Sequence, residues 1–556
     1  MYDYIIIGGG SAGCVLANRL SEDPETTVCL LEAGPADKSP FVRIPLGMAA
    51  LLRSPSLNWA FRTEPQAGLG GRRGYQPRGK VLGGSSSINA MVYIRGHRSD
   101  YDGWAEAGNS GWSFDEVLPY FKRAENQERG ADAFHGVGGP LNVADLRSPH
   151  AICDDFIAAA EEQGHKRVSD FNGPDMEGVG YFQVTQQAGD RCSTAKAYLE
   201  PVADRPNLTI ITEAYATRID MEGKRAVGVR YRKDDASHHV GARKEVLVSA
   251  GALQSPQLLM LSGIGPREEL DQHGIPICHE LAGVGANLQD HLDYVTAVKS
   301  PSKEPLGISL SGGWQMLQAL RTYRRFRTGK LTSNVAEAGG FLRSDPSLAA
   351  PDLQLHFAVA ILDDHGRKLH SGHGYSCHVC LLTPKSRGRV GLHSANPMAA
   401  PRIDPAFLSE DEDLERLVKG FRRMQEILNA PAMARHRGRD IYTAHVRTDE
   451  QIRSAIRQRA DTVYHPVGTC RMGRDSDAVV DEQLRVHGVA GLRVVDASIM
   501  PTVVRGNTNA PTIMIGEKAA EMIRFPDVAS SRSAAVTKSA ARSAPKRRAT
   551  RATEPA

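Results

Sequence analysis

The sequence predicts an α/β fold in which a Rossmann-like dinucleotide-binding domain, built from separate stretches of the chain, carries a second domain of mixed sheet and helix. A strand, a glycine loop, a helix and a second strand follow one another within the first 35 residues. Another strand-to-helix unit lies at residues 244–263, and segments that alternate apolar and polar residues lie between 301 and 461. With 556 residues the chain is long enough for two domains.

The first unit carries a phosphate-binding pattern. Residues 3–7 and 27–31 are apolar runs typical of buried strands, and residues 11–20 have helical spacing. Between them the run from Gly8 through Gly10 to Gly13 matches G-x-G-x-x-G, whose glycines let a pyrophosphate approach the backbone at the start of a helix. Glu32 follows the second strand at the distance expected for a carboxylate that binds a ribose hydroxyl. A tight turn in another α/β protein is the alternative to a dinucleotide site, and the loop alone does not separate FAD from NAD.

Later segments extend both domains. Residues 245–249 predict a strand, followed by a helix with Ser255 as N-cap, Pro256 in its first turn and Gly263 at its end. We expect half-buried strands at 353–359 and 375–381, helices at 411–427 and 511–524, and a buried strand at 492–496. The predicted division assigns 1–155, 191–300 and 462–526 to the dinucleotide domain, 156–190 and 301–461 to the substrate-binding domain, and 527–556 to a disordered basic tail.

Charge is concentrated at the C-terminus. The net charge is +4, but residues 530–556 hold seven basic residues and one acidic residue, so the rest of the chain carries −2. A slightly acidic body argues against a nucleic-acid groove. The tail is either a tether to anionic lipid or nucleic acid, or a solvated extension without a function.

Targeting and cysteine patterns predict a cytoplasmic protein, at most peripheral at the inner membrane. The chain begins with a strand-like run rather than a secretory signal, and it has no apolar run of the roughly 18 residues that span a bilayer. Eight scattered cysteines do not resemble a disulfide framework.

Two further features of the sequence are candidates for a functional site. The run from His370 to Cys380 is rich in His and Cys, but on a strand Cys377 faces away from His378 and Cys380, so we expect no metal site. Glu337 either faces a substrate cavity or forms a salt bridge within the second domain.

Several long motifs resemble the glucose–methanol–choline (GMC) oxidoreductases. The motifs that carry this resemblance are the runs at residues 78–96, 249–265, 465–473, 494–501 and 506–514, and it extends over residues 2–524. Within the family the chain looks most like bacterial FAD-linked alcohol dehydrogenases of the type that oxidises medium-chain alcohols in alkane degradation. Choline dehydrogenase looks somewhat more distant.

The resemblance implies FAD rather than NAD. The residues that it and the glycine loop place at the cofactor are Gly8, Gly10, Ser11, Ala12, Gly13, Glu32, Ala33, Gly83, Gly84, Ser85, Asn89, Ala90, Met91, Val92, Ala216, Asp496, Ala497, Asn507, Pro511 and Thr512. Some family members attach the flavin through a histidine in the first signature. Ile88 occupies that position here, so we expect non-covalent FAD.

The resemblance also assigns the chemistry. His465 would take the hydroxyl proton of a primary, aliphatic alcohol while hydride passes to flavin N5, and Asn509 would hold the substrate oxygen. The product would be the aldehyde, with electrons passed to a quinone or another acceptor. Alternatives are an oxidase that uses oxygen, a choline dehydrogenase-like enzyme, and an FAD-containing enzyme that resembles hydroxynitrile lyases and performs no net oxidation.

Overall fold

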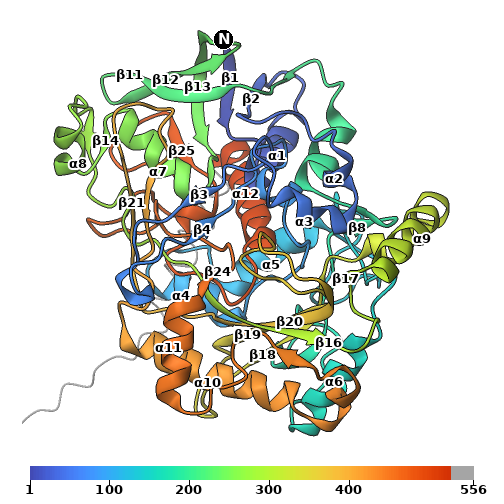
Figure 1. Ribbon diagram of the computed structural model, residues 1–556. Helices are drawn as coiled ribbons and strands as arrows, with labels where there is room; N and C mark the ends of the chain where they lie inside the picture. The colour runs from blue at the N-terminus through green and yellow to red at the C-terminus, as the bar shows by residue number, and fades with distance from the viewer. Residues whose placement is uncertain (527–556) are drawn as a thin grey trace, which may run out of the picture.

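The computed structural model describes residues 1–526, so the predictions for the basic tail lie outside the described residues. Two sheets organise the molecule, one in the upper and one in the lower half of Figure 1. The first sheet has the order β10 (Leu208–Ile211), β2 (Val28–Leu31), β1 (Tyr2–Ile7), β13 (Ala236–Val248), β12 (Arg225–Lys233) and β11 (Tyr215–Glu222), with β25 (Leu492–Val494) also paired to β13. β10, β2, β1, β13 and β25 run parallel, which confirms a Rossmann-like domain built from distant parts of the chain.

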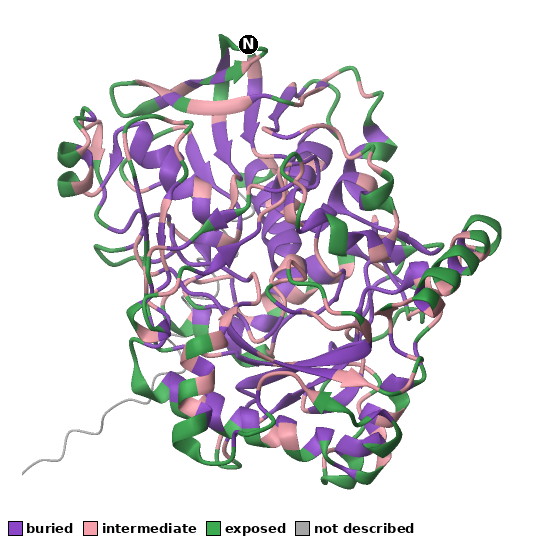
Figure 2. Ribbon diagram, in the orientation of Figure 1, coloured by how far each residue is buried: buried purple, intermediate pink, exposed green. Residues whose placement is uncertain are grey.

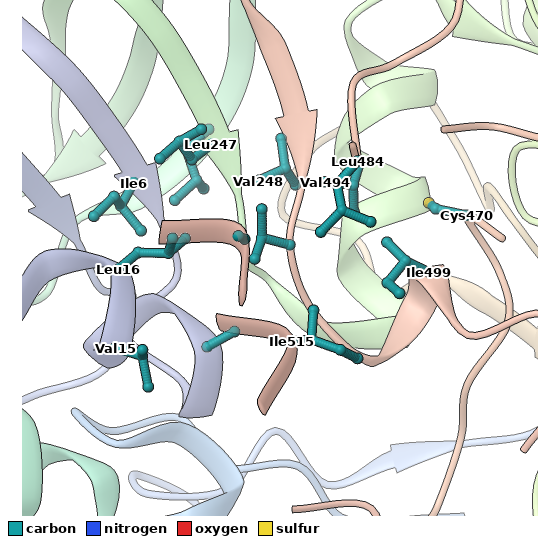
Figure 3. Packing of buried hydrophobic residues seen from close by; sticks show 14 of the residues in the cluster. Ile6, Val15, Leu16, Leu247, Val248, Cys470, Leu484, Val494, Ile499 and Ile515 are labelled. Atoms are coloured by element: carbon teal, nitrogen blue, oxygen red, sulfur yellow. The ribbon is translucent and has the colours of Figure 1, made fainter. Parts of the chain in front are cut away.

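The largest core forms where the first sheet meets two helices. α1 (Ser11–Leu20) and α12 (Asn509–Arg524) lie side by side, although nearly 500 residues separate them in sequence. Ile6 of β1, Leu16 of α1, Val248 of β13 and Ile515 of α12 converge in this core (Figure 3). The C-terminal helix therefore closes the domain that the N-terminal strand begins, as the sequence predicts.

The helix after β13 starts earlier than predicted. α7 (Gly251–Leu261) begins at Gly251, so Ser255 is not its N-cap and Pro256 lies inside it. Asp496, which follows β25, accepts hydrogen bonds from the Gly251 amide at 2.8 Å and the Ser255 hydroxyl at 2.5 Å. A carboxylate from a distant strand thus caps the helix, and local sequence gives no sign of it.

The second sheet is antiparallel. Its order is β23 (Arg439–Asp440), β16 (Leu292–Ser300), β20 (Gly372–Leu381), β19 (Leu353–Ala358), β18 (Ala336–Leu342) and β7 (Gly178–Tyr181), with β17 (Gly307–Ile308) on β20 and β24 (Asp461–Thr462) on β16. Helices α6 (Ile152–Glu162) and α10 (Asp411–Leu428) pack against one face. By sheet and core membership, the domain division expected after residue 300 falls before Leu292, and the one expected after residue 155 falls before Ile152.

The alternation expected in β19 and β20 is present, but the strands are more deeply buried than expected: every residue of β19 is buried, and in β20 only Gly372 and His378 are partly exposed. Leu355 and Cys377 point into the core beneath α10, whereas His356 and His378 point to the opposite face and line a cavity. Cys380 packs in a different cluster from Cys377, as predicted. The polar face of this sheet is therefore the wall of a site and is not exposed to solvent.

Shorter elements complete the fold. The remaining helices are α2 (Pro40–Arg43), α3 (Met48–Leu51), α4 (Arg98–Glu106), α5 (Phe114–Ala124), α8 (Arg267–Gln272), α9 (Leu310–Phe326) and α11 (Asp449–Arg459). The remaining strands are β3 (Phe61–Arg62), β4 (Tyr75–Gln76), β5 (Glu125–Gln127), β6 (Leu141–Val143), β8 (Gln186–Gln187), β9 (Asp190–Arg191), β14 (Ile264–Gly265), β15 (His279–Glu280), β21 (Arg389–Gly391) and β22 (Arg402–Asp404). Within residues 1–526 no helix has both the length and the apolar character needed to cross a bilayer.

Candidate active site

A cavity of about 470 Å³ lies between the two sheets. Its walls include the residues that follow the carboxyl ends of parallel strands β1, β2, β13 and β25, where α/β sheets bind ligands. Most of the predicted site lines it: Gly8, Gly10, Ser11, Ala12, Glu32, Ala33, Gly84, Ser85, Asn89, Ala90, Met91, Val92, Ala216, His465, Asp496, Ala497, Asn507, Asn509 and Thr512. Gly13, Gly83 and Pro511 do not line it.

The glycine loop fits a pyrophosphate. A Cβ on Gly13 would lie 1.9 Å from the Gly8 carbonyl oxygen, so Gly13 is required for packing rather than for contact with a ligand. A Cβ on Gly10 would meet no protein atom closer than 4.0 Å, which leaves the space above the start of α1 free for a ligand. The Glu32 carboxylate accepts hydrogen bonds from the Gly9 and Gly34 amides, each at 2.8 Å, and burial raises its pKa to about 7.

A hydrogen bond and close packing hold the first family motif, residues 78–96, against the glycine loop. The Gly83 amide donates to the Gly9 carbonyl at 2.7 Å, and a Cβ on Gly84 would come within 2.7 Å of the Gly10 Cα. Gly83 therefore positions the cavity wall without forming part of it. The Asn89 side-chain oxygen accepts from the Met91 amide at 3.0 Å and from the Arg191 guanidinium at 2.8 Å, so it shapes the loop that lines the cavity.

His465 lies on the wall next to the second sheet and is only 7% exposed. Its backbone amide donates to the Asp290 carboxylate at 2.9 Å, and the preceding residue, Tyr464, has φ of +76°. Asp290 also accepts from the Thr462 hydroxyl at 2.5 Å and from the Gln76 amide at 3.0 Å. This buried carboxylate fixes the backbone from which the imidazole projects.

Hydrogen-bond directions define the tautomer of His465. Nε2 of His291 lies 3.1 Å from the Leu382 carbonyl oxygen, which can only accept, so this nitrogen carries the proton. Burial lowers the pKa of His291 to about 4, so its ring is neutral at pH 7 and its Nδ1 is an acceptor. Nδ1 of His465 lies 3.0 Å from that acceptor and must therefore carry a hydrogen. The Nε2 atom of His465 is left as a proton acceptor.

The side-chain amide beside that acceptor is that of Asn507; Asn509, which the sequence predicts for this place, also lines the cavity. Nδ2 of Asn507 lies 3.2 Å from Nε2 of His465, and the Asn507 side-chain oxygen accepts from Gln354 at 3.2 Å, which fixes the orientation of the amide. The side-chain oxygen of Asn509 instead accepts from the Ser11 hydroxyl at 2.7 Å, at the start of α1. Only Thr508 separates the two asparagines in sequence, so the motif alone does not distinguish them.

Three histidines gather around this point. Burial lowers the pKa of His465 well below its usual value, and the positive charge of Arg78 acts in the same direction. Burial also lowers the pKa of His356 to about 3. The imidazole of His465 is therefore neutral at physiological pH and available to accept a proton.

Glu337 does not line the cavity. It is fully buried, and within residues 1–526 the group at ion-pair distance from its carboxylate is the ring of His150. Its carboxylate accepts from the His150 amide at 2.7 Å and from the Ser333 hydroxyl at 2.5 Å, and it lies 2.8 Å from the His150 ring. The sequence does not point to His291 and Asp290. Their role follows only from the packing of β16 against the segment that carries His465.

Comparison with known proteins decides the family. The models of the N-terminal and C-terminal parts of GMC oxidoreductases match residues 2–293 and 384–516. The chain belongs to the GMC oxidoreductase family. It is an FAD-binding oxidoreductase that acts on CH–OH groups.

Relatives of this GMC oxidoreductase cover nearly its whole length. It is 52% identical to an alcohol dehydrogenase [acceptor] of Pseudomonas putida over 95% of this chain and 97% of that protein. It is 44% identical to the mitochondrial choline dehydrogenase of Homo sapiens, over 94% of this chain and 90% of that protein. The structure of a formate oxidase from Aspergillus oryzae, studied for modification of its FAD, superposes with a TM-score of 0.89 at 27% identity, over 95% of this chain and 98% of that one.

Proposed function

We propose that this GMC oxidoreductase oxidises uncharged, primary, aliphatic alcohols to aldehydes, with His465 as the base and Asn507 as the group that holds the substrate oxygen. Nε2 of His465 accepts the hydroxyl proton, while Nδ2 of Asn507 donates a hydrogen bond to the same oxygen. Bound FAD would supply the acceptor for the hydride that leaves the carbinol carbon. The residues around the glycine loop, Glu32 and the segment 84–92 would hold it.

The observation that carries this proposal is a chain of hydrogen bonds in which Nδ1–H of His465 donates to Nδ1 of His291, and Nε2–H of His291 donates to the Leu382 carbonyl. It presents an unprotonated ring nitrogen to the cavity without the need for a charged partner. Because the ring is neutral and buried, it can take up a proton and release it again within one reaction cycle.

The cavity favours a neutral substrate over a quaternary ammonium. Two carboxylates of its wall lie against imidazole rings: Oδ2 of Asp293 lies 2.6 Å from His378, although Oδ1 of Asp293 has no partner within residues 1–526, and Asp461 lies 3.0 Å from His365. Aromatic rings that could face a cation are few, since the Trp, Tyr and Phe residues that line it within residues 1–526 are Trp59, Tyr215 and Tyr464. Trp59 and Tyr215 lie against each other, and the neighbouring Ala214 amide donates to the Glu32 carbonyl, so these two rings border the part of the cavity where Glu32 lies.

The electron acceptor and the attachment of FAD are part of the same proposal. We infer a quinone or another external acceptor, in keeping with the wording used for the Pseudomonas relative. Ile88 packs with Val42, Leu51 and Val81 at the cavity wall and offers no nucleophile, which supports non-covalent FAD. Cofactor released into the supernatant by acid precipitation of the protein would agree with this, and yellow colour retained in the pellet would contradict it.

An anaerobic screen of alcohols tests the function. Mixing with a medium-chain primary alcohol should bleach the flavin absorbance, whereas choline should not. An enzyme of the hydroxynitrile-lyase type would leave the flavin oxidised with every alcohol. Reoxidation by a quinone much faster than by oxygen would support a dehydrogenase, and the reverse order would indicate an oxidase.

Paired asparagine variants test the site. Asn507→Ala should slow anaerobic bleaching by about tenfold or more with the FAD content intact, since it removes one hydrogen bond to the reacting oxygen. Asn509→Ala, which breaks the contact with Ser11, should mainly lower the FAD content. His465→Ala should reduce the bleaching rate by about 10²–10⁴-fold. The opposite ranking of the two asparagine variants would restore Asn509 as the substrate-binding residue.

A further inference from the structure

Helix α9 projects from the body of the molecule at the right of Figure 1. Its inner side is held firmly: Ala319 and Tyr323 pack with Leu331 against Ile44 and Leu46. The Tyr323 hydroxyl and the Arg327 guanidinium both contact the Asp190 carboxylate. The helix is therefore anchored along one side, and its orientation on the surface is fixed.

The outer side of α9 exposes large apolar side chains. Leu310 is 98% exposed, Trp314 60% and Leu317 59%, and their i, i+4, i+7 spacing aligns them on one stripe. Figure 2 shows this helix largely in the colour of exposed residues. Ile308, just before the helix, is 53% exposed. A run of exposed Leu, Trp and Ile marks an interaction surface rather than an ordinary solvated helix.

The same stripe becomes basic in the second half of the helix. Arg321 and Arg324 continue it at i+11 and i+14, and Arg325 lies beside them. Residues 306–329 contain no Asp or Glu. Within residues 1–526, no carboxylate lies within ion-pair distance of Arg321, Arg324 or Arg325. The surface thus combines an exposed apolar patch with uncompensated positive charge.

We propose that the outer face of α9 docks this protein on the surface of an anionic lipid bilayer. Leu310, Trp314 and Leu317 would enter the boundary between headgroups and acyl chains, a depth that suits Trp. Arg321, Arg324 and Arg325 would lie against lipid phosphates. The inference does not depend on the alcohol proposed above.

A second copy of the chain fits this face poorly. Antiparallel pairing of two α9 helices would lay the apolar half of one against the arginines of the other, and parallel pairing would oppose arginine to arginine. A bilayer can contact the apolar and the basic half of the α9 face at the same time, because its acyl chains and phosphates lie within a few ångströms of each other.

The inner side of α9 packs on a segment that continues into the cavity wall. Leu46, which packs beneath α9, is followed by Met48 and Leu52, which line the cavity wall. Lipid bound at α9 would therefore bring the membrane surface next to the site, where an apolar substrate or acceptor could be exchanged.

Vesicle flotation with the full chain carrying FAD tests the proposal. The protein should float with vesicles of mixed phosphatidylglycerol and phosphatidylcholine and not with phosphatidylcholine alone. The variant Leu310→Glu/Leu317→Glu should abolish flotation, and each Arg→Gln change at 321, 324 or 325 should weaken binding by about fivefold, as expected for about 1 kcal/mol per charge. Val137→Glu and Met398→Glu replace exposed apolar residues elsewhere and should leave flotation unchanged.

Trp314 provides a direct probe. Trp104 and Trp112 are fully buried and Trp59 lines the cavity, so quenching by vesicles with brominated acyl chains should come from Trp314. Trp314→Phe should lose the quenching and still float. Flotation of the double Glu variant at the wild-type level, or the absence of quenching, would overturn the proposal. So would a dimer in solution that Leu317→Glu splits, in a protein that does not bind vesicles.

Discussion

The Nδ1 atom of His465 faces another histidine, where a carboxylate would be the more common partner. A carboxylate would stabilise the protonated ring, whereas the neutral His291 only fixes its tautomer. His291 is thus a positioning residue that acts through His465. The proton taken from an alcohol would rest on a ring whose charged form is disfavoured by burial, so it should leave quickly.

Replacing His291 tests this role. His291→Leu removes the acceptor for the Nδ1 hydrogen of His465, so anaerobic bleaching should slow by about tenfold, the value of one hydrogen bond. His291→Gln, whose side-chain oxygen can accept, should recover part of the rate. Affinity for the alcohol should change little in either variant. A purely structural role would instead lower the FAD content of both variants and leave the bleaching rate of the loaded fraction unchanged.

At the scale of elements, α7 shows how distant segments complete a local structure. Pro256 has no N–H to bind the carbonyl of Ala252 one turn earlier. The hydroxyl of Thr469, from the segment after His465, donates to that carbonyl at 2.6 Å. This hydrogen bond links α7, which borders the cavity, to the segment that carries His465.

A double-mutant cycle tests the hydrogen bond from Thr469 to the Ala252 carbonyl. Thr469→Val keeps the shape of the side chain but leaves the buried Ala252 carbonyl without a donor, so it should cost about 1–3 kcal/mol of unfolding free energy. In a Pro256→Ala background the new backbone N–H can donate to the Ala252 carbonyl. Thr469→Val should then lower the free energy of unfolding by clearly less than it does in the wild type. Urea unfolding of the four proteins gives the comparison. Equal costs in both backgrounds would show that Thr469 stabilises the protein by another contact.

The three buried histidines around the site should lower the stability of the protein as pH falls below about 6.5, the usual pKa of histidine. His291, His356 and His465 have lowered pKa values in the folded protein because they are buried, so at these positions the unfolded chain binds more protons in this range. Their contribution to the free energy of unfolding therefore rises with pH and falls on acidification, whereas Glu32, whose pKa burial raises to about 7, contributes in the opposite direction. Each buried histidine should contribute a loss of about 1.4 kcal/mol between pH 7.5 and 5.5.

Removing one of these histidines should make the free energy of unfolding depend less steeply on pH. His356→Asn should reduce the difference in unfolding free energy between pH 7.5 and 5.5 by about 1.4 kcal/mol, measured by urea unfolding. Substitution of the exposed His445 provides the control and should leave the difference unchanged. An unchanged difference in the His356 variant would mean that this ring binds its proton equally well in the folded and in the unfolded chain.

The sequence by itself determined the parallel core and the binding loop, since both follow from local patterns. Apolar runs fix buried strands, and the spacing of Gly8, Gly10 and Gly13 fixes a turn that exposes the start of a helix. The alternation at β19 also came from the sequence, although the pattern could not tell a cavity wall from solvent. His356 is polar on a buried strand because it faces the site.

Only the tertiary structure decided which side chains meet. Asn507 and Asn509 belong to one short motif and both are polar, but the start of α12 turns Asn507 toward His465 and Asn509 toward Ser11. Ser255 is a residue type that favours the N-cap, but Asp496, which follows β25, binds the Gly251 amide where that helix starts. Such pairings depend on contacts between segments tens to hundreds of residues apart. Local propensity carries no information about them, because packing of the whole chain sets which segments come together.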